Sequence, residues 1–402
     1  MKILYFGTIC EKEHYERIYA DFRSKPSVAP FTFESALLKG FAENGAELEA
    51  VSFPVIPAFP KSKHLAWGFR KEVLESGYRT TWISTVNISG IKQLSQRFTS
   101  ALLLKKWLKD NEQEEKAVLI YSAYQPVSKS IVTLCKKYHT KCYAVIPDLP
   151  RDMYRIARVN PVKKTLSRFY VRAAEQVQGK FDGYIYLTEK MKDVINPDAP
   201  YTIVEGIANV SEGGTIALED KAPGKVIMYA GALNEKLGIG NMIQAFMRLP
   251  HQDARLWLFG SGDFEEEIKK YATKDPRIEF WGRVSRQEIL RYEQQATLLV
   301  NVRNDQDEFT RYSFPSKVIE YMLSGTPMLM TKLSGIPDEY EKYTYCIYDN
   351  GIETIRAEME RICSQPSDVL MAFGEQAQQF IVSEKNSYRQ VKKIMQLIVE
   401  NA

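Results

Sequence analysis

The chain has 402 residues, of which 45% are hydrophobic and 26% charged, and these ordinary globular values exclude an intrinsically disordered protein. Its length suits two domains, no apolar run approaches the roughly 18 residues of a membrane-spanning helix, and a net charge of +4 does not by itself indicate nucleic-acid binding. Five cysteines without a Cys-x-x-Cys pair predict reduced thiols rather than disulfides or a zinc site.

The first half of the chain alternates short apolar runs with helical stretches. A strand over 3–6, rather than a signal peptide, is expected near the start of the sequence, and a helix over 33–43 ends at Asn44 and Gly45. Further strands are predicted at 48–53, 81–85, 118–122, 142–146, 184–187 and 201–204, with helices at 91–109, 127–137 and 163–178. Several strands are apolar throughout, as parallel strands buried on both faces are, so the pattern predicts a doubly wound parallel sheet.

The polar, glycine-rich segment 211–224 is the predicted linker between two domains. After it the alternation restarts, with strands at 226–230, 256–259, 278–281, 298–302 and 328–331 and helices at 242–249, 264–271, 287–294 and 316–323. The sequence therefore predicts an α/β protein with two Rossmann-like domains, 1–210 and 225–380, facing each other across a cleft. Residues 381–402 are expected to form a helix that packs back on the first domain.

Three strands of the second domain run into glycine-containing turns. The glycines are Gly231, the pair Gly260 and Gly262, and Gly282, which precedes Arg283 and Val284. The carboxyl ends of parallel strands meet at one edge of a sheet, where open α/β sheets bind ligands. Lys236, in the first of these loops, can neutralise a diphosphate as a point charge, although a solvated lysine in an ordinary turn is the alternative.

The most informative segment is a long polar loop from Arg303 that leads into a helix. Pro315 starts this helix, and Ser316 and Lys317 stand in its first turn, where free N–H groups and the helix dipole favour a phosphate. Glu320, one turn later, can accept two hydroxyl hydrogen bonds, as from a ribose. The alternative is a helix whose early glutamate only favours the dipole.

Residues 314–327, Phe-Pro-Ser-Lys-x-x-Glu-Tyr-x-x-Ser-Gly-Thr-Pro, resemble the donor-site signature of retaining glycosyltransferases of the GT-B fold. The subfamily resembled is glycosyltransferase family four, in the branch common in capsule and exopolysaccharide clusters. The resemblance covers the C-terminal domain and implies that this domain holds a nucleotide sugar, with a UDP-sugar favoured, while the N-terminal domain faces the acceptor.

The resemblance also assigns roles to individual residues. Lys236, Lys317 and the N–H groups around Ser316 would contact the diphosphate, Glu320 the ribose, and the backbone of Val284 the base. The residues expected to line the nucleotide-sugar site are Gly7, Gly231, Asn234, Lys236, Gly260, Gly262, Arg283, Val284, Arg303, Phe314, Pro315, Ser316, Lys317 and Glu320.

Two positions depart from the family pattern and bear on catalysis. Ala232 stands where an arginine is frequent, and Tyr312 stands where the first of two paired glutamates is usual, so that Glu308 is the nearest upstream acid. The expected catalytic residues are Glu308, Lys236 and Asp148. Asp148 ends a buried strand of the first domain and can orient an acceptor hydroxyl or act as a base, or else only bond its own turn.

No His/Cys cluster occurs in the sequence, and no metal and no other cofactor is expected. Lysines and a helix dipole would stabilise the diphosphate instead. An inactive glycosyltransferase-like partner subunit is the main alternative, motivated by Ala232 and Tyr312. A dinucleotide oxidoreductase would need Gly-x-Gly-x-x-Gly after the first strand, which residues 7–12 do not supply.

Residues 151–180 contain eight basic and two acidic residues with aromatic residues between them. Such a segment suits an anionic membrane surface, or else a solvated helix face. The expected partners are thus a nucleotide sugar, a glycan or lipid-linked acceptor and an anionic membrane, but no nucleic acid. The expected location is the cytoplasm, peripherally at the inner face of the cell membrane. The expected pathway is bacterial surface polysaccharide synthesis.

Overall fold

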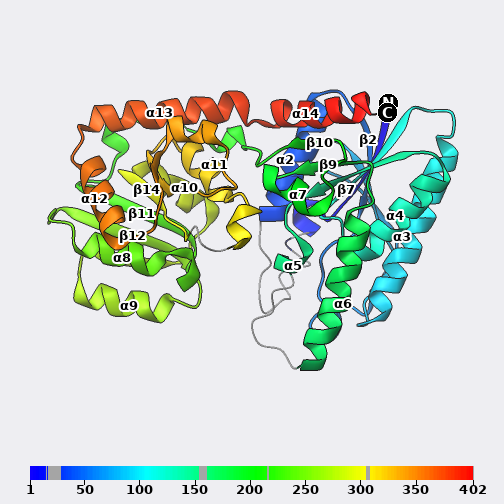
Figure 1. The fold of residues 1–402 in the computed structure, drawn as a ribbon, viewed down its shortest axis with the longest axis horizontal. Helices are drawn as coiled ribbons and strands as arrows, with labels where there is room; N and C mark the ends of the chain where they lie inside the picture. Colours follow the sequence, from blue (N-terminus) through cyan, green and yellow to red (C-terminus); the bar gives the residue numbers. More distant parts are fainter. Residues whose placement is uncertain (15, 17–28, 154–160, 215–216, 305–307, 402) are drawn as a thin grey trace. The chain divides into compact units, whose positions relative to one another are not determined.

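The computed structural model describes residues 1–14, 16, 29–153, 161–214, 217–304 and 308–401. The chain divides into two compact units, one formed by Met1–Ile207 with Ser387–Ala402 and the other by Ala208–Asn386 (Figure 1). Each unit holds a predominantly parallel sheet with helices on both faces, so the predicted α/β fold with two Rossmann-like units is confirmed.

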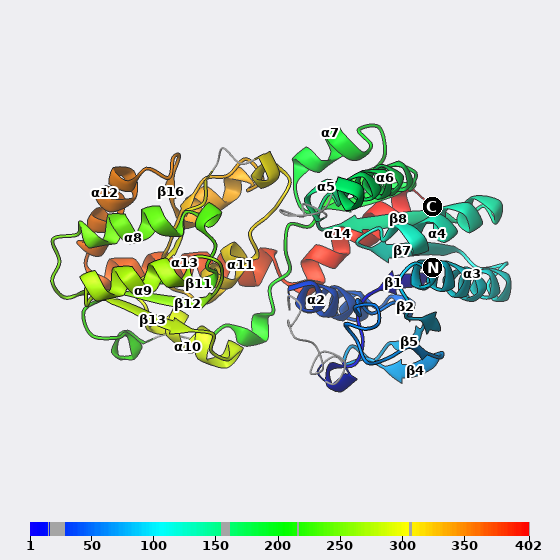
Figure 2. The same cartoon turned by 90° about the horizontal axis from the view of Figure 1, so that it is seen from below.

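The first unit contains an eight-stranded sheet in the order β10-β9-β8-β7-β1-β2-β5-β4 (Figure 2). All neighbouring strands are parallel except β4 and β5. The strands are β1 (Lys2–Gly7), β2 (Glu47–Ser52), β4 (Arg70–Val73), β5 (Arg79–Trp82), β7 (Lys116–Tyr121), β8 (Lys141–Ile146), β9 (Gly183–Tyr186) and β10 (Tyr201–Ile203), and β3 (Ala66–Trp67) pairs separately with β6 (Thr85–Val86). The strand order reverses between β1 and β7. The loops that follow these two strands therefore lead in opposite directions at that edge of the sheet.

The helices of this unit are α2 (Ala29–Glu43), α3 (Ile91–Asp110), α4 (Gln125–Lys137), α5 (Pro150–Met153), α6 (Pro161–Gln178), α7 (Lys192–Ile195) and α14 (Ser387–Glu400). The last helix, α14, packs against α2 and contributes Val391, Ile394 and Ile398 to the core of the first unit. A Cβ atom on Gly40 of α2 would lie 2.4 Å from the backbone oxygen of Ser387, so the two helices approach too closely for any side chain at that position.

The second unit contains a six-stranded, fully parallel sheet in the order β13-β12-β11-β14-β15-β16. Its strands are β11 (Lys225–Ala232), β12 (Ala254–Ser261), β13 (Ile278–Gly282), β14 (Leu298–Asn301), β15 (Met328–Thr331) and β16 (Tyr345–Ile347). Its α-helices are α8 (Ile239–Met247), α9 (Glu265–Lys274), α10 (Arg286–Gln295), α11 (Ser316–Leu323), α12 (Ile352–Cys363) and α13 (Ser367–Glu384). The strand order reverses between β11 and β14, and α11 follows β14.

The unit boundaries differ from the predicted linker. The first unit ends at Ile207, and residues 211–224 belong to the second unit. The Lys221 ammonium donates to the carbonyl of Ala296 at 2.8 Å and to Oγ1 of Thr326 at 2.9 Å, and the N–H of Ala222 donates to Gln295. The segment is polar, as linkers are, but these hydrogen bonds fix it to the second unit. The chain leaves that unit after Asn386, a few residues beyond the predicted end at 380.

All five cysteines are free thiols, as predicted. In the described part of the chain, no helix is both long and apolar enough to cross a membrane.

Gly260, near the end of β12, allows the close approach of β11 and β12. Gly260 has a φ of 125°, and a Cβ atom there would lie 1.8 Å from the backbone oxygen of Gly231. We expect Gly260→Ala to lower the free energy of unfolding by more than the roughly 1–3 kcal/mol of backbone strain alone. Urea unfolding measures this effect. Gly282→Ala is the control, because Gly282 also has a positive φ, of 66°, but a Cβ atom there would meet no other atom within 4 Å. Equal losses in both variants would contradict a role for the close approach of β11 and β12.

Candidate functional site

The turns after β11 and β12 are held side by side. The N–H of Leu233 donates to the carbonyl of Ser261 at 3.0 Å, and that of Phe264 donates to Leu233 at 3.0 Å. Oδ1 of Asn234 accepts a hydrogen bond of 3.3 Å from the N–H of Asp263. The structure thus brings together four residues of the predicted site, Gly231, Asn234, Gly260 and Gly262.

The turn after β13 adjoins this pair of turns. Arg283 is exposed, and its Nε donates to Oγ of Ser261 at the end of β12. Val284, predicted to meet the base through its backbone, is half-buried and directly precedes Ser285. Ser285 caps α10 in a reciprocal capping box with Glu288, which fixes the course of the chain there.

The predicted phosphate and ribose residues lie together in the first two turns of α11. Nζ of Lys317 donates to Oε1 of Glu320 at 2.5 Å and stands 5.4 Å from the centre of the Tyr321 ring. The Tyr321 hydroxyl accepts from the N–H of Ala230 at 2.8 Å and donates to its carbonyl at 3.1 Å. This buried tyrosine therefore fixes α11 against the carboxyl-terminal half of β11.

Arg303, which follows β14, is a second cation near Lys317. Its Nε is buried and has no hydrogen-bond partner among the described residues, and burial lowers the pKa of its guanidinium. Burial raises the pKa of the Tyr229 hydroxyl, while both Arg303 and Lys317 act to lower it, so both cations lie close to this tyrosine. A buried donor without a partner is costly, and an anion placed here would satisfy it. Ser316, the first residue of α11, is exposed beside them.

The charges around Glu320 keep it ionised. Burial opposes its ionised form, but Lys317, the neighbouring Glu293 and the nearby Arg286 together lower the pKa of Glu320. Burial likewise opposes the charge on Lys317, yet Glu320 and Glu293 raise its pKa. Nη1 of Arg286 lies 3.6 Å from Oε2 of Glu320, so the carboxylate stands between two cations.

Sequence reasoning missed Glu293, Arg286 and Glu212. Glu293 on α10 is 0% exposed, and burial and the charge of Glu320 raise its pKa well above the usual range. Arg286 donates from Nε to Oε1 of Glu212 at 3.0 Å. In the sequence both Glu293 and Arg286 belong to a polar helix typical of a solvated surface, so only the packing of α10 beside α11 reveals their place.

Two residues of the predicted site are buried. Phe314 is only 7% exposed, and its ring centre lies 5.4 Å from that of Tyr340, so its ring packs in the core at the start of α11. Pro315 is also buried, at the N-cap of α11.

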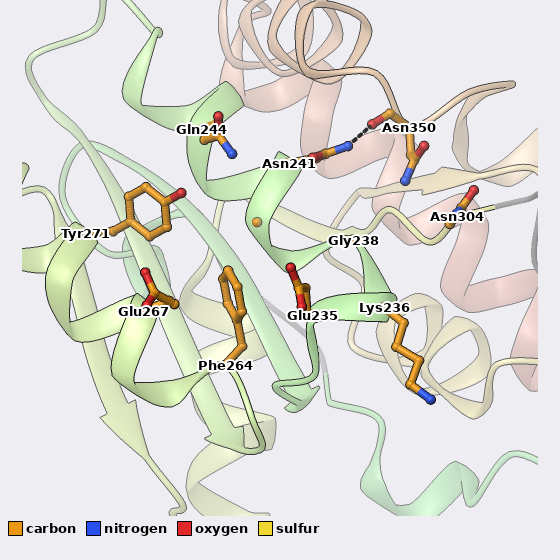
Figure 3. A pocket seen from close by; sticks show the side chains of 11 residues that line it. Glu235, Lys236, Gly238, Asn241, Gln244, Phe264, Glu267, Tyr271, Asn304 and Asn350 are labelled. Atoms are coloured by element: carbon orange, nitrogen blue, oxygen red, sulfur yellow. Dashed lines mark hydrogen bonds between the residues drawn. The ribbon is translucent and has the colours of Figure 1, made fainter. Parts of the chain in front are cut away.

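Lys236 lines a polar pocket of about 440 Å³ between α8 and α9, which Asn304 also lines. It lies in a short 3₁₀ helix (Glu235–Leu237), and its exposed ammonium points away from the other labelled side chains in Figure 3. The described contacts do not connect Lys236 with Lys317 or Glu320, so its predicted diphosphate contact stays a prediction. Glu308 is exposed at the start of a 3₁₀ helix (Glu308–Arg311), and the preceding residues 305–307 lie outside the described residues.

In the first unit, Gly7 is the last residue of β1, and Asp148 follows the carboxyl end of β8. A carboxyl group that the sequence did not point to, Glu34 of α2, occupies this edge. Glu34 accepts hydrogen bonds from the Tyr5 hydroxyl at 2.7 Å and from the N–H of Thr8 at 2.9 Å, and burial raises its pKa to about 7. A Cβ atom on Gly7 would lie 2.0 Å from Oε2 of Glu34, which explains the glycine structurally.

Residues 224–365, within the second unit, match the family model described as "Glycosyl transferases group 1". No curated protein matches the chain. Among solved structures, the chain is similar to Anabaena HepE in complex with UDP, with a TM-score of 0.64 and 13% identity over 100% of both chains. It is also similar to the lipopolysaccharide outer core galactosyltransferase WaaB in its apo form, with a TM-score of 0.63 and 14% identity over 100% of both chains.

A third similar structure is the α,α-trehalose 6-phosphate synthase of Burkholderia multivorans, with a TM-score of 0.63 and 10% identity over 99% of this chain and 96% of that one. At these identities the likeness shows the fold, and the predicted GT-B architecture is confirmed. Together with the domain match, it also confirms the expected enzyme class, a glycosyltransferase.

Proposed function

We propose that this chain is a retaining glycosyltransferase of family four that transfers a hexosyl group from a UDP-sugar to a glycan or lipid-linked acceptor. The observation that carries the proposal is that two cations act on the buried Tyr229. They are Lys317, in the first turn of α11, and Arg303, whose buried Nε has no hydrogen-bond partner among the described residues. Two cations beside the N-terminus of α11, at the sheet edge where the strand order reverses between β11 and β14, suit a diphosphate. HepE, a protein of the same fold, has been solved in complex with UDP and with UDP-glucose, which supports the choice of donor.

The chemistry follows from where charge develops. When the bond between the sugar and the diphosphate breaks, negative charge grows on the leaving phosphate oxygens, and donors fixed beforehand stabilise it without reorganising. Lys317, Arg303 and the α11 N–H groups would supply these donors in place of a metal, while Glu320 would hold the ribose hydroxyls. We propose that the new bond forms on the face that the diphosphate leaves, with retention at the anomeric carbon.

We also propose the class of acceptor and the location of the enzyme. A lipid-linked acceptor of bacterial surface polysaccharide synthesis would bring the enzyme to the cytoplasmic face of the membrane. The basic segment 151–180 supports this in part, since Arg168, Arg172 and Lys180 are exposed. Its residues Arg155 and Arg158 lie outside the described residues. Asp148 and Glu308 keep their predicted catalytic roles within the proposal.

Nucleotide binding tests the proposal directly. A ligand that binds only the folded protein stabilises it by about 2.7 kcal/mol at a hundred times its dissociation constant. We expect UDP to raise the melting temperature equally with magnesium and with EDTA, and ADP, GDP, CMP and NAD to raise it less. Release of UDP from a UDP-hexose, with the anomeric configuration of the product followed by NMR, then tests the transfer.

The remaining outcomes are also informative. No stabilisation by any nucleoside diphosphate would favour the inactive partner subunit over the enzyme. A strict need for magnesium would contradict the role given to Lys317 and Arg303. A product of inverted configuration would overturn the retaining mechanism while leaving the donor site intact.

A further inference from the structure

Helix α3 exposes a row of large apolar side chains. Ile91 is 48% exposed, Leu94 67%, Phe98 64% and Leu102 48%. Their spacing of three or four residues places them on one face of the helix. The core-facing side of α3 is filled by other residues, Leu104, Trp107 and Leu108. Because the core already has its own contacts from α3, the exposed row is free to bind something outside the unit, and we call it the α3 row.

A hollow of about 350 Å³ adjoins the α3 row. It lies between α3 and α4, and Leu94, Phe98 and Ala101 line it from one side and Leu134 from the other. Thr133, Ser130 and Arg97 supply its few polar atoms. An apolar hollow that continues an exposed apolar row increases the area that an apolar partner could cover.

The charge of the surrounding helices identifies the partner's chemistry. Helices α3, α4 and α6 lie side by side (Figure 1). Their sequences contain twelve lysines and arginines against two acids, Asp110 and Glu175. Their net charge is therefore +10, while the whole chain carries +4, so the rest of the chain carries −6. Arg97, Lys105 and Lys109 are exposed on α3 itself, and Lys129, Lys136 and Lys137 on α4.

We propose that the α3 row and its hollow dock on the surface of an anionic lipid bilayer. Leu94 and Phe98 enter the boundary between headgroups and acyl chains, and the lysines and arginines of α3 and α4 contact anionic headgroups. Apolar side chains beside basic ones are the composition of helices that lie in the membrane interface. A second copy of the chain is a poorer occupant, because the exposed lysines and arginines of α3 and α4 on the two copies would repel each other. The inference does not depend on the proposed sugar transfer.

Vesicle co-sedimentation tests the proposal. The full chain is mixed with vesicles of equal parts phosphatidylglycerol and phosphatidylcholine, and with vesicles of phosphatidylcholine alone. We expect binding to the anionic vesicles, and at least tenfold weaker binding for the double variant Leu94→Ser, Phe98→Ser. The control is Phe69→Ser, Val73→Ser, because these residues are also apolar, 53% and 60% exposed, and in the same unit, but not on α3, α4 or α6. We expect this control to bind like the wild type.

A second variant separates charge from insertion. Lys105→Gln, Lys109→Gln should weaken binding to anionic vesicles, and raising the salt concentration should weaken wild-type binding similarly. The proposal is overturned if the Leu94 and Phe98 variant binds as tightly as the control. It is also overturned if the wild type ignores the vesicles but forms a dimer by light scattering that this variant abolishes. The UDP melting shift should be unchanged in all these variants, so a failure here is distinct from failure of the proposed function.

Discussion

Replacing Lys317 with methionine is expected to weaken UDP binding by about 10- to 100-fold. A charge-assisted hydrogen bond to a phosphate contributes roughly 1.5–3 kcal/mol, which corresponds to this loss in affinity. The variant should also be less stable, because Glu320 loses the ammonium 2.5 Å from its Oε1 and retains Arg286 at 3.6 Å. Calorimetric titration with UDP measures the first effect and urea unfolding the second.

The second unit offers a matched control in Lys385→Met. Lys385 is 3% exposed, its Nζ lies 2.6 Å from Glu339 and 5.2 Å from the centre of the Tyr340 ring, much as Lys317 lies beside Glu320 and Tyr321. We expect Lys385→Met to lose stability but to keep its affinity for UDP. If the two variants bind UDP alike, Lys317 does not contact the diphosphate and the proposed donor site is wrong.

Replacing Glu293 with glutamine is expected to change how stability depends on pH. The pKa of Glu293 in the folded protein is raised, by burial first and then by Glu320, so the folded state holds a proton that the unfolded chain releases above its ordinary pKa of 4.5. The contribution of Glu293 to the free energy of unfolding of the wild type is therefore fully present at low pH. It is lost as the pH rises toward the pKa of Glu293 in the folded protein. Glutamine is neutral at every pH and lacks this loss.

Urea unfolding of both proteins at pH 5, 6, 7 and 8 measures the difference. We expect the stability of Glu293→Gln relative to wild type to rise by on the order of 1 kcal/mol per pH unit within this window. Glu34, whose raised pKa of about 7 acts in the same direction, is present in both proteins and cancels in the difference. Glu288→Gln, a surface change on the same helix, should leave the slope unaltered. A difference independent of pH would mean that Glu293 is ionised in the folded protein.

Local sequence patterns by themselves predicted most elements of the two Rossmann-like units and their order, but not β4, β16, α12 or α13. Apolar runs specify buried parallel strands wherever they stand, so helix 316–323 and strand 328–331 were predicted with the bounds that the structure has. The sequence also predicted the turn glycines and the Lys317–Glu320 pair. The position of each is set locally, by the end of a strand or by one turn of a helix.

Contacts between residues distant in the sequence decided the rest. Only the tertiary structure places Glu293 beside Glu320 and Glu34 against Gly7, because each pair comes from different elements whose packing no local pattern encodes. The same holds for Phe314, because its packing against Tyr340 joins two segments that are distant in the sequence. Exposure is likewise a property of the folded unit, so the sequence predicted that α3 is a helix, whereas the packing decided which of its apolar residues remain uncovered.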